Sequence, residues 1–130
     1  MFVDAPIAHV CLAGPRVCND WRLIQALKVR HPVTLVEQAA LLAGDPMLGT
    51  VQVLALDGDA AALEEGDFLS RLKRSYPALY VLLVDGALDQ RRLATGFQQG
   101  ARDYFPEPYD VRLLAERIEY FCDRPPAGGS

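Results

Sequence analysis

Length, composition and charge indicate one globular domain that binds neither nucleic acid nor a membrane. The chain has 130 residues, of which 51% are hydrophobic and 23% are charged, which is the balance of an ordinary single-domain protein. A net charge of −4 provides no positive field to attract nucleic acid or an anionic membrane.

Five short apolar runs along the chain predict five strands. In chain order they are Ala8–Ala13, Val33–Val36, Val51–Leu56, Ala78–Val84 and Arg102–Phe105. The second, third and fourth runs are rich in β-branched residues and leucine and contain almost no polar residue. This pattern is typical of strands that are covered on both faces, as in a parallel sheet.

The segments that follow the first three runs have helical spacing. The first segment carries one apolar stripe, formed by Val17, Trp21, Ile24 and Leu27. A short second helix is expected around Ala39–Leu48, where Gly44 and Pro46 interrupt the pattern. The third begins at Asp67, a residue type that caps helices, and ends before Pro77.

Two further helices follow the fourth and fifth runs. The fourth helix begins at Asp89, ends at Gly100 and is expected to turn Leu93, Ala94 and Phe97 inward. The fifth is capped by Asp110 and directs its apolar positions toward the core.

Alternation of strand and helix five times predicts an α/β fold, a doubly wound (βα)5 domain with a five-stranded parallel sheet. We place this domain at residues 1–123. The tail 124–130, rich in Pro and Gly, is interpreted as a linker or a tail added in cloning. In such folds the functional crevice lies at the carboxyl ends of the strands.

The spacing of the cysteines and histidines and the lack of a recognisable signal peptide point to an ordinary intracellular protein. The three cysteines lack CxxC spacing, and neither His9 nor His31 has a partner at metal-ligand spacing, so we expect free thiols, structural histidines, no metal and no cofactor. The apolar runs are too short to span a bilayer, and no signal peptide is recognisable. We expect a cytoplasmic location.

Two stretches of the sequence resemble the response-regulator receiver (CheY-like) family. Residues 51–57, VQVLALD, resemble the third strand of receivers, which ends in the phospho-accepting aspartate. Residues 100–108, GARDYFPEP, resemble the family pattern Gly-Ala-x-Asp-Tyr-x-x-Lys-Pro. The resemblance covers nearly the whole chain and implies a CheY-like, flavodoxin-like fold with Asp57 at the acceptor position and Tyr104 at the switch aromatic.

Carried over residue by residue, the resemblance implies a degenerate active site, that of a pseudo-receiver. Gly14 and Pro15 stand where receivers place the acidic pair that holds Mg²⁺, Asp85 where they place a hydroxyl, and Glu107 where they place a lysine. Gly14 and Pro15 offer no side-chain oxygen to a hard cation.

The charges at these positions disfavour phosphorylation. Carboxylates about 5–7 Å apart repel by roughly 2–3 kcal/mol per pair at an effective dielectric constant near 20. A phosphoryl group on Asp57 would meet Asp85 and Glu107 and no counter-ion, whereas phosphoryl transfer depends on cations. We therefore expect Asp57 to be inactive as an acceptor.

Each of these residues also has a plainer interpretation. Asp57 is followed by Gly58, and its side chain can simply close an Asx-turn. Asp85 and Glu107 can be solvated loop acids, or members of a carboxylate cluster whose raised pKa values sense pH or attract a stray cation. Tyr104 can be a core aromatic rather than a switch.

Three functions remain in view. The first is a phosphorylation-independent, non-enzymatic regulatory and protein-interaction module of a bacterial signal-transduction or transcription regulator. The second is a working phospho-acceptor that uses Asp57 in a two-component phosphorelay. The third, a flavodoxin-like domain that binds a small molecule, has no recognisable site.

The resemblance places the interaction surface on the fourth helix, fifth strand and fifth helix. There the domain is expected to form a homodimer or to contact an output domain of the same protein. We expect the outward side chains Arg91, Arg92, Gln98, Arg112, Glu116, Arg117 and Glu119 to form this surface. Mixed Arg and Glu suit a two-fold contact, because opposite charges can then pair across the axis.

Overall fold

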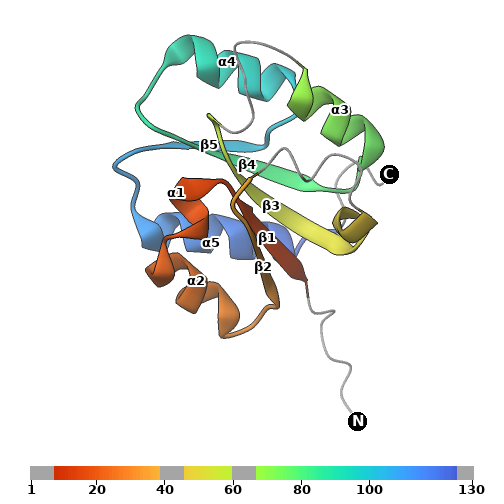
Figure 1. Ribbon diagram of the computed structural model, residues 1–130, viewed down its shortest axis with the longest axis vertical. Coiled ribbons are helices and arrows are strands. Elements are labelled where there is room, and N and C mark those ends of the chain that lie inside the picture. The colour runs from red at the N-terminus through yellow and green to blue at the C-terminus, as the bar shows by residue number, and fades with distance from the viewer. Residues whose placement is uncertain (1–7, 39–45, 60–66, 126–130) are drawn as a thin grey trace.

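A parallel sheet of five strands forms the centre of the protein (Figure 1). The computed structural model describes residues 8–38, 46–59 and 67–125. The strands are β1 (His9–Ala13), β2 (Val33–Val36), β3 (Val51–Asp57), β4 (Tyr80–Asp85) and β5 (Asp103–Pro106), in the order β2-β1-β3-β4-β5. Every neighbouring pair is parallel, which confirms the predicted doubly wound α/β fold.

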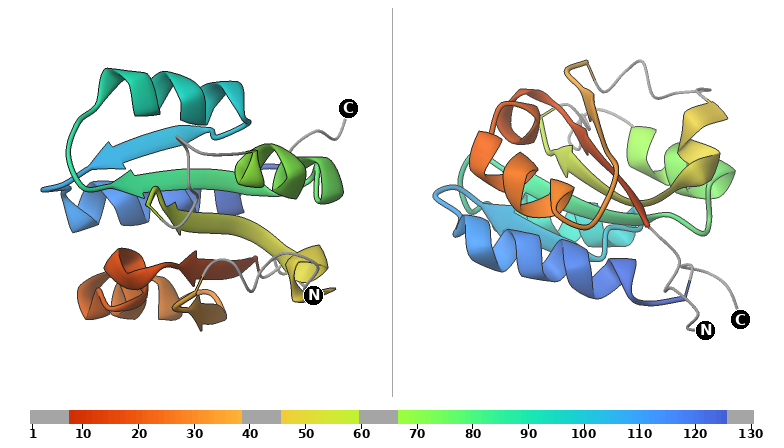
Figure 2. Two further views of the ribbon diagram at one scale, coloured as in Figure 1. Left: turned by 45° about the horizontal axis from the view of Figure 1, so that its top comes forward. Right: turned by 90° about the horizontal axis from the view of Figure 1, so that it is seen from below.

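Helices cover both faces of the sheet (Figures 1 and 2). The helices are α1 (Pro15–Cys18), α2 (Trp21–Lys28), the 3-10 helix η2 (Pro46–Thr50), α3 (Phe68–Ser75), α4 (Gln90–Gln98) and α5 (Val111–Cys122). Helices α1, α2 and α5 lie on one face, and α3 and α4 lie on the other. No helix in the described ranges is long and apolar enough to cross a bilayer.

The two faces of the sheet bury separate apolar clusters. Alternate residues of one strand point to opposite faces, so Leu54 and Leu56 of β3 join the cluster under α3 and α4, while Val53 and Ala55 join the cluster under α2 and α5. All four side chains are fully buried. This double coverage explains why the strand sequences contain so few polar residues.

The first predicted helix is in fact two helices. Asp20 interrupts it and caps α2, accepting a hydrogen bond from the Leu23 N–H at 3.2 Å. The interruption resets the helical register, so that Leu23 and Leu27 are buried while Trp21 is 68% exposed. Of the predicted stripe, Val17 and Leu27 belong to the core cluster, Ile24 packs against it, and only the prediction for Trp21 is wrong.

Helix α4 begins where predicted, but its buried side differs from the prediction. The Asp89 carboxylate caps it by accepting hydrogen bonds from the N–H groups of Arg91 and Arg92. Gly96 packs against the sheet so closely that a Cβ there would lie 2.4 Å from Leu83. This contact turns Phe97 outward, where it is 43% exposed, and Ala94 is exposed too, so neither points inward as predicted.

The expected second helix and the tail after residue 123 lie at the limits of the described residues. Most of the helix expected around Ala39–Leu48 lies outside them, and its described end belongs to η2. After α5 the chain stays in contact with the domain as far as Pro125. Gln52 donates a hydrogen bond to the Arg124 carbonyl at 2.7 Å, and the Tyr80 hydroxyl donates one to the Pro125 carbonyl at 2.5 Å.

Candidate functional site

The carboxyl ends of β1, β3, β4 and β5 meet at one edge of the sheet, as the parallel topology requires. Gly14 follows β1, Asp57 and Asp85 end β3 and β4, and Glu107 follows β5. Asp57 and Asp85 are the two buried carboxylates among the described residues. The sequence prediction that these positions gather at one edge is confirmed.

Asp57 has no exposed surface and accepts three hydrogen bonds. Its Oδ1 accepts from Nη1 of Arg16 at 2.5 Å and from the N–H of Asp59 at 3.1 Å, and its Oδ2 accepts from the N–H of Arg16 at 3.2 Å. The bond from Asp59 closes an Asx-turn, the plainer interpretation of Asp57. The other two bonds bind the carboxylate to the first turn of α1.

Arg16 reaches across the strand ends and joins three carboxylates. Besides Asp57, its Nη1 lies 2.8 Å from Asp59, and its Nε lies 2.6 Å from Glu107. Burial alone would lower the pKa of Arg16, but the carboxylates of Glu107 and Asp59 raise it well above its ordinary value. The guanidinium is therefore a permanent cation beside Asp57.

This geometry corrects the expected electrostatics. Asp57, Asp85 and Glu107 were expected to repel one another with no counter-ion, but Arg16 pairs with Asp57 and Glu107, and Arg92 pairs with Asp85. Sequence reasoning missed both arginines as site residues. A signal was present, because Arg16 follows β1 by three residues and Arg92 follows the cap of α4 by three, so both lie on first helical turns that face the strand ends.

Gly14 is the residue that lets Arg16 and Asp57 come together. Its φ of +104° belongs to a region that favours glycine, and a Cβ built on it would lie 2.2 Å from Cβ of Asp57. An acidic side chain cannot occupy this position while β1 and β3 keep their present spacing. At Gly14, both the backbone conformation and the lack of a side-chain oxygen are therefore unsuited to binding Mg²⁺.

A second ion pair lies beside the first, on β4. Nε and Nη2 of Arg92 lie 2.7 and 2.8 Å from the two oxygens of Asp85, a bidentate contact. The Tyr104 hydroxyl donates to the same carboxylate at 2.5 Å, and Tyr104 is buried. Arg92 also contacts Asp59 at 3.2 Å, so Asp59 joins the two arginines into one cluster.

The pKa of Asp85 does not support a pH-sensing carboxylate cluster with raised pKa values. Burial alone would raise the pKa of Asp85, but hydrogen bonds from Arg92, Tyr104 and the Gly86 N–H bring it below its usual value. Burial and the neighbouring Asp85 raise the pKa of Tyr104 to about 12. Asp85 is thus an ionised acceptor and Tyr104 a neutral donor at physiological pH.

The predicted interface residues lie in three different places. Arg92 points into the site instead of outward, because Asp85 binds its guanidinium. Arg91 and Gln98 are exposed on α4. On α5, Arg117 pairs with Asp103 of β5 at 2.8 Å, whereas Arg112, Glu116 and Glu119 line a pocket on the side toward α2.

The histidines have structural contacts. His9 lies 2.6 Å from the Thr34 hydroxyl, and the buried His31 lies 2.9 Å from Glu119 of α5. Within the described residues, no group of three or more His, Cys, Asp or Glu side chains is arranged to hold a metal ion. Cys11, Cys18 and Cys122 are free thiols.

Comparison with known proteins gives both sequence and structural relatives. No family model matches the chain. It is similar to the DNA-binding transcriptional regulator NtrC, with 29% identity to that of Escherichia coli K12 over 85 residues, 65% of this chain. Identity to NtrC of Klebsiella pneumoniae is 30% over 67 residues, or 52% of this chain.

Three solved structures share the fold over about nine-tenths of the chain. An orphan response regulator of H. pylori gives a TM-score of 0.76 at 22% identity and covers 90% of this chain and 99% of that one. An atypical orphan response regulator, described as having a phosphorylation-independent regulatory mechanism, gives 0.74 at 21%, with 92% and 99% covered. These likenesses show that the chain has the fold of receiver domains. A Burkholderia pseudomallei protein named as related to pilus assembly gives 0.69 at 22%, with 89% and 90% covered.

The chain is similar to only a small part of its sequence relatives. The matched region covers 17% of E. coli NtrC and 13% of K. pneumoniae NtrC. Those regulators therefore contain much more than the part to which this chain is similar.

Proposed function

We propose that this domain is a phosphorylation-independent regulatory module that acts by binding other proteins rather than by catalysis. It would serve a bacterial signal-transduction or transcription regulator. The observation that carries the proposal is the ion pair between Arg16 and the fully buried Asp57.

The ion pair disfavours phosphorylation because the acceptor oxygens are already engaged. Both oxygens of Asp57 accept hydrogen bonds, and the Arg16 guanidinium that covers them is held in addition by Asp59 and Glu107. A phosphoryl donor would have to displace a guanidinium bound to three carboxylates. Hydrogen bonds to charged groups stabilise by about 1.5–3 kcal/mol each, so this displacement is costly.

In this proposal the second ion pair fixes the positions of Tyr104 and α4, which a phosphoryl group would otherwise have to fix. Asp85 holds the Tyr104 ring in a buried position and binds Arg92 of α4 at the same time. The contact between α4 and the end of β4 is therefore maintained by groups of the chain itself. In this proposal the α4–β5–α5 face keeps one conformation, ready to bind without modification.

The α4–β5–α5 face is the proposed docking surface. Leu88, just before α4, and Phe97 of α4 are exposed apolar side chains, and Arg91 and Gln98 of α4 are exposed as well. Apolar side chains at the centre of a polar rim are typical of protein interfaces. Its partner would be an output domain of the same protein or a second copy of the chain.

Incubation with acetyl phosphate and Mg²⁺, followed by intact mass spectrometry, tests the proposal. We expect no phosphoryl adduct on the parent domain, as on an Asp57→Asn control that cannot form one. A stable adduct on the parent that Asp57→Asn abolishes would establish the alternative, a working phospho-acceptor in a two-component phosphorelay.

A further inference from the structure

Three aromatic rings form a cluster at the carboxyl end of α5, at the opposite end of the sheet from the arginine ion pairs. Tyr80, which begins β4, and Phe121 of α5 are buried, with ring centroids 4.7 Å apart. Tyr120 meets Phe121 edge-on at 5.1 Å and is itself 44% exposed. The cluster therefore extends from the core to the surface.

Three guanidiniums lie on these rings and form what we call the arginine platform, namely Arg102, Arg117 and Arg124. Arg102 and Arg117 both lie over the Phe121 ring, with their guanidinium carbons 5.8 and 5.2 Å from its centroid. Arg117 and Arg124 both lie over the Tyr120 ring, at 5.0 and 4.9 Å. Because Arg117 shares a ring with each of the other two, the three cations are close together, and contact with the ring faces stabilises them there.

The positive charge of the arginine platform is compensated only in part. Arg117 pairs with Asp103 at 2.8 Å. Arg102 and Arg124 are exposed, and neither has an ion-pair partner within the described residues. The excess charge extends to α3, where burial and the nearby Arg102 lower the pKa of Lys73.

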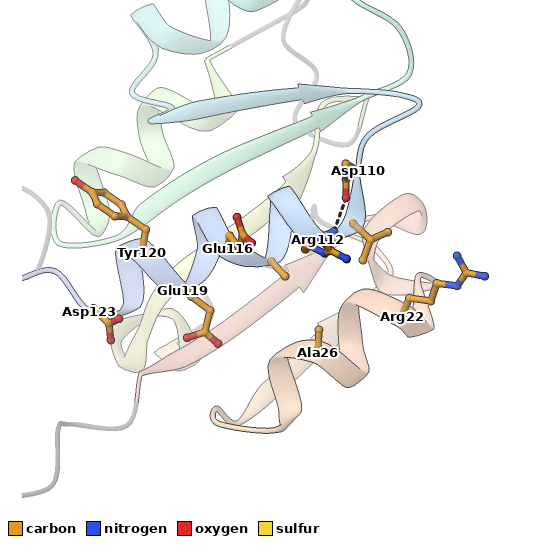
Figure 3. A pocket seen from close by; sticks show the side chains of 10 residues that line it. Arg22, Ala26, Asp110, Arg112, Glu116, Glu119, Tyr120 and Asp123 are labelled. Carbon is orange, nitrogen blue, oxygen red and sulfur yellow. Dashed lines mark hydrogen bonds between the residues drawn. The ribbon is translucent and has the colours of Figure 1, made fainter.

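The acidic side chains of α5 do not neutralise the platform. Figure 3 shows Glu119 and Asp123 pointing from one side of α5 and Tyr120 from the other. On their own side, Glu119 and Asp123 lie 3.2 and 4.0 Å from Arg30. Glu116 lies one turn before Tyr120, and in the described part of the chain it forms no ion pair with the platform. The platform thus has unused capacity to bind carboxylates.

An acidic segment of a protein has the chemistry that fits this surface. A guanidinium offers a planar fork of N–H donors that pairs with both oxygens of a carboxylate. Because the rings already hold these forks in place, less side-chain freedom is lost on binding. Nucleic acid fits less well, since the guanidiniums occupy ring faces on which bases would stack, and the net charge of −4 repels a polyanion.

We propose that the arginine platform docks an acidic segment of a partner protein. The inference rests on the proposed function, in which the domain acts by binding other proteins, and it adds the chemistry of the partner. Arg102 directly precedes β5, Arg117 belongs to α5 and Arg124 follows it. The platform therefore continues the α4–β5–α5 face toward the amino ends of the strands.

Fluorescence anisotropy with a fluorescein-labelled oligoglutamate peptide tests this assignment on the unmodified domain. The parent should bind the peptide at low salt with a Kd at or below about 100 μM, and the affinity should fall as salt is added. Arg102→Glu and Arg124→Glu should each weaken binding about tenfold, because each replaces an attractive charge with a repulsive one.

Arg22→Glu is the matched control, and circular dichroism checks that every variant is folded. Arg22 is exposed on α2 beside the opposite end of α5 (Figure 3), so its reversal changes the net charge equally and should alter the Kd by less than about twofold. The assignment is wrong if the parent does not bind the peptide at about 1 mM. It is also wrong if Arg22→Glu weakens binding as much as Arg102→Glu does, or if single-stranded DNA with the same label binds more tightly than the peptide.

Failure of this assay and failure of the proposed function are distinguishable. Peptide binding is measured without a phosphoryl donor, so a negative result removes the platform and leaves the state of Asp57 untouched. A phosphoryl adduct on Asp57 would instead contradict the proposed function while leaving the measured Kd of the unmodified domain as it stands.

Discussion

At the scale of single residues, the arginines determine what the site can do. A carboxylate as deeply buried as Asp57 is stabilised only if a partner offsets the loss of hydration. Arg16 is that partner, and its side chain is itself only 25% exposed. In our proposal, the guanidinium that stabilises the buried Asp57 also blocks the chemistry expected at an acceptor position.

Asp85 gives a prediction for the pH dependence of stability. Its folded-state pKa lies below its ordinary value of 3.8, so its contribution to stability is complete above that value and is lost as pH falls through the lower, folded-state pKa. Asp85→Asn should reduce the free energy of unfolding by about 2–4 kcal/mol at pH 7, because Arg92 loses its buried carboxylate. The difference from the parent should shrink below about pH 4.

Urea unfolding at neutral and acidic pH measures this effect, and Asp67→Asn is its control. Asp67 pairs with Arg71 on the surface, where both side chains are 64% exposed, so its replacement should change stability by less than about 1 kcal/mol. The interpretation of Asp85 is wrong if Asp85→Asn matches the parent at pH 7 or if the difference grows on acidification.

At this scale, the length of a side chain decided whether its place in the site could be predicted from the sequence. Asp57, Asp85 and Glu107 were predictable as neighbours because each follows directly from a strand end. Arg16 and Arg92 were harder to assign, because a long side chain on a helix can turn to solvent or to the sheet. Only the folded arrangement shows that buried carboxylates attract both.

At the scale of elements, strands and caps were predictable and helix faces were less so. The predicted strands agree with the observed ones to within two residues at each end, since strands buried on both faces have an unmistakable composition. The face of a short helix depends instead on contacts that are distant in sequence. The cap at Asp20 and the close packing of Gly96 against Leu83 changed which side chains of α2 and α4 are buried.

The junction between β1 and α1 gives a prediction for Gly14. Gly14→Ala should lower the free energy of unfolding by about 2–4 kcal/mol, because the new Cβ would overlap Asp57 and the backbone conformation is unfavourable for alanine. Gly49→Ala is the matched control, since a Cβ there has no heavy atom within 4 Å, and should change stability by less than about 0.5 kcal/mol. Thermal and urea unfolding of both variants measure the difference. Equal stability of the two variants would show that β1 and β3 do not approach as described.

At the scale of the whole molecule, two regions have separate tasks in this account. The strand-end edge holds the two arginine ion pairs, and the α4–β5–α5 face is proposed to bind an output domain. Asp85 connects the first region to the second through Tyr104 and Arg92. This connection passes through fixed ion pairs, so the proposed binding state requires no phosphoryl group.

The most direct measurement of the central claim is a Mg²⁺ titration of the parent domain followed by amide NMR. If Arg16 occupies the acceptor position in place of a divalent cation, the amide signals of Asp57, Asp59 and Glu107 should shift little and without saturation up to about 10 mM Mg²⁺. Saturable shifts centred on these residues below about 1 mM, abolished by Asp57→Ala, would contradict the account, because Mg²⁺ would then displace the guanidinium.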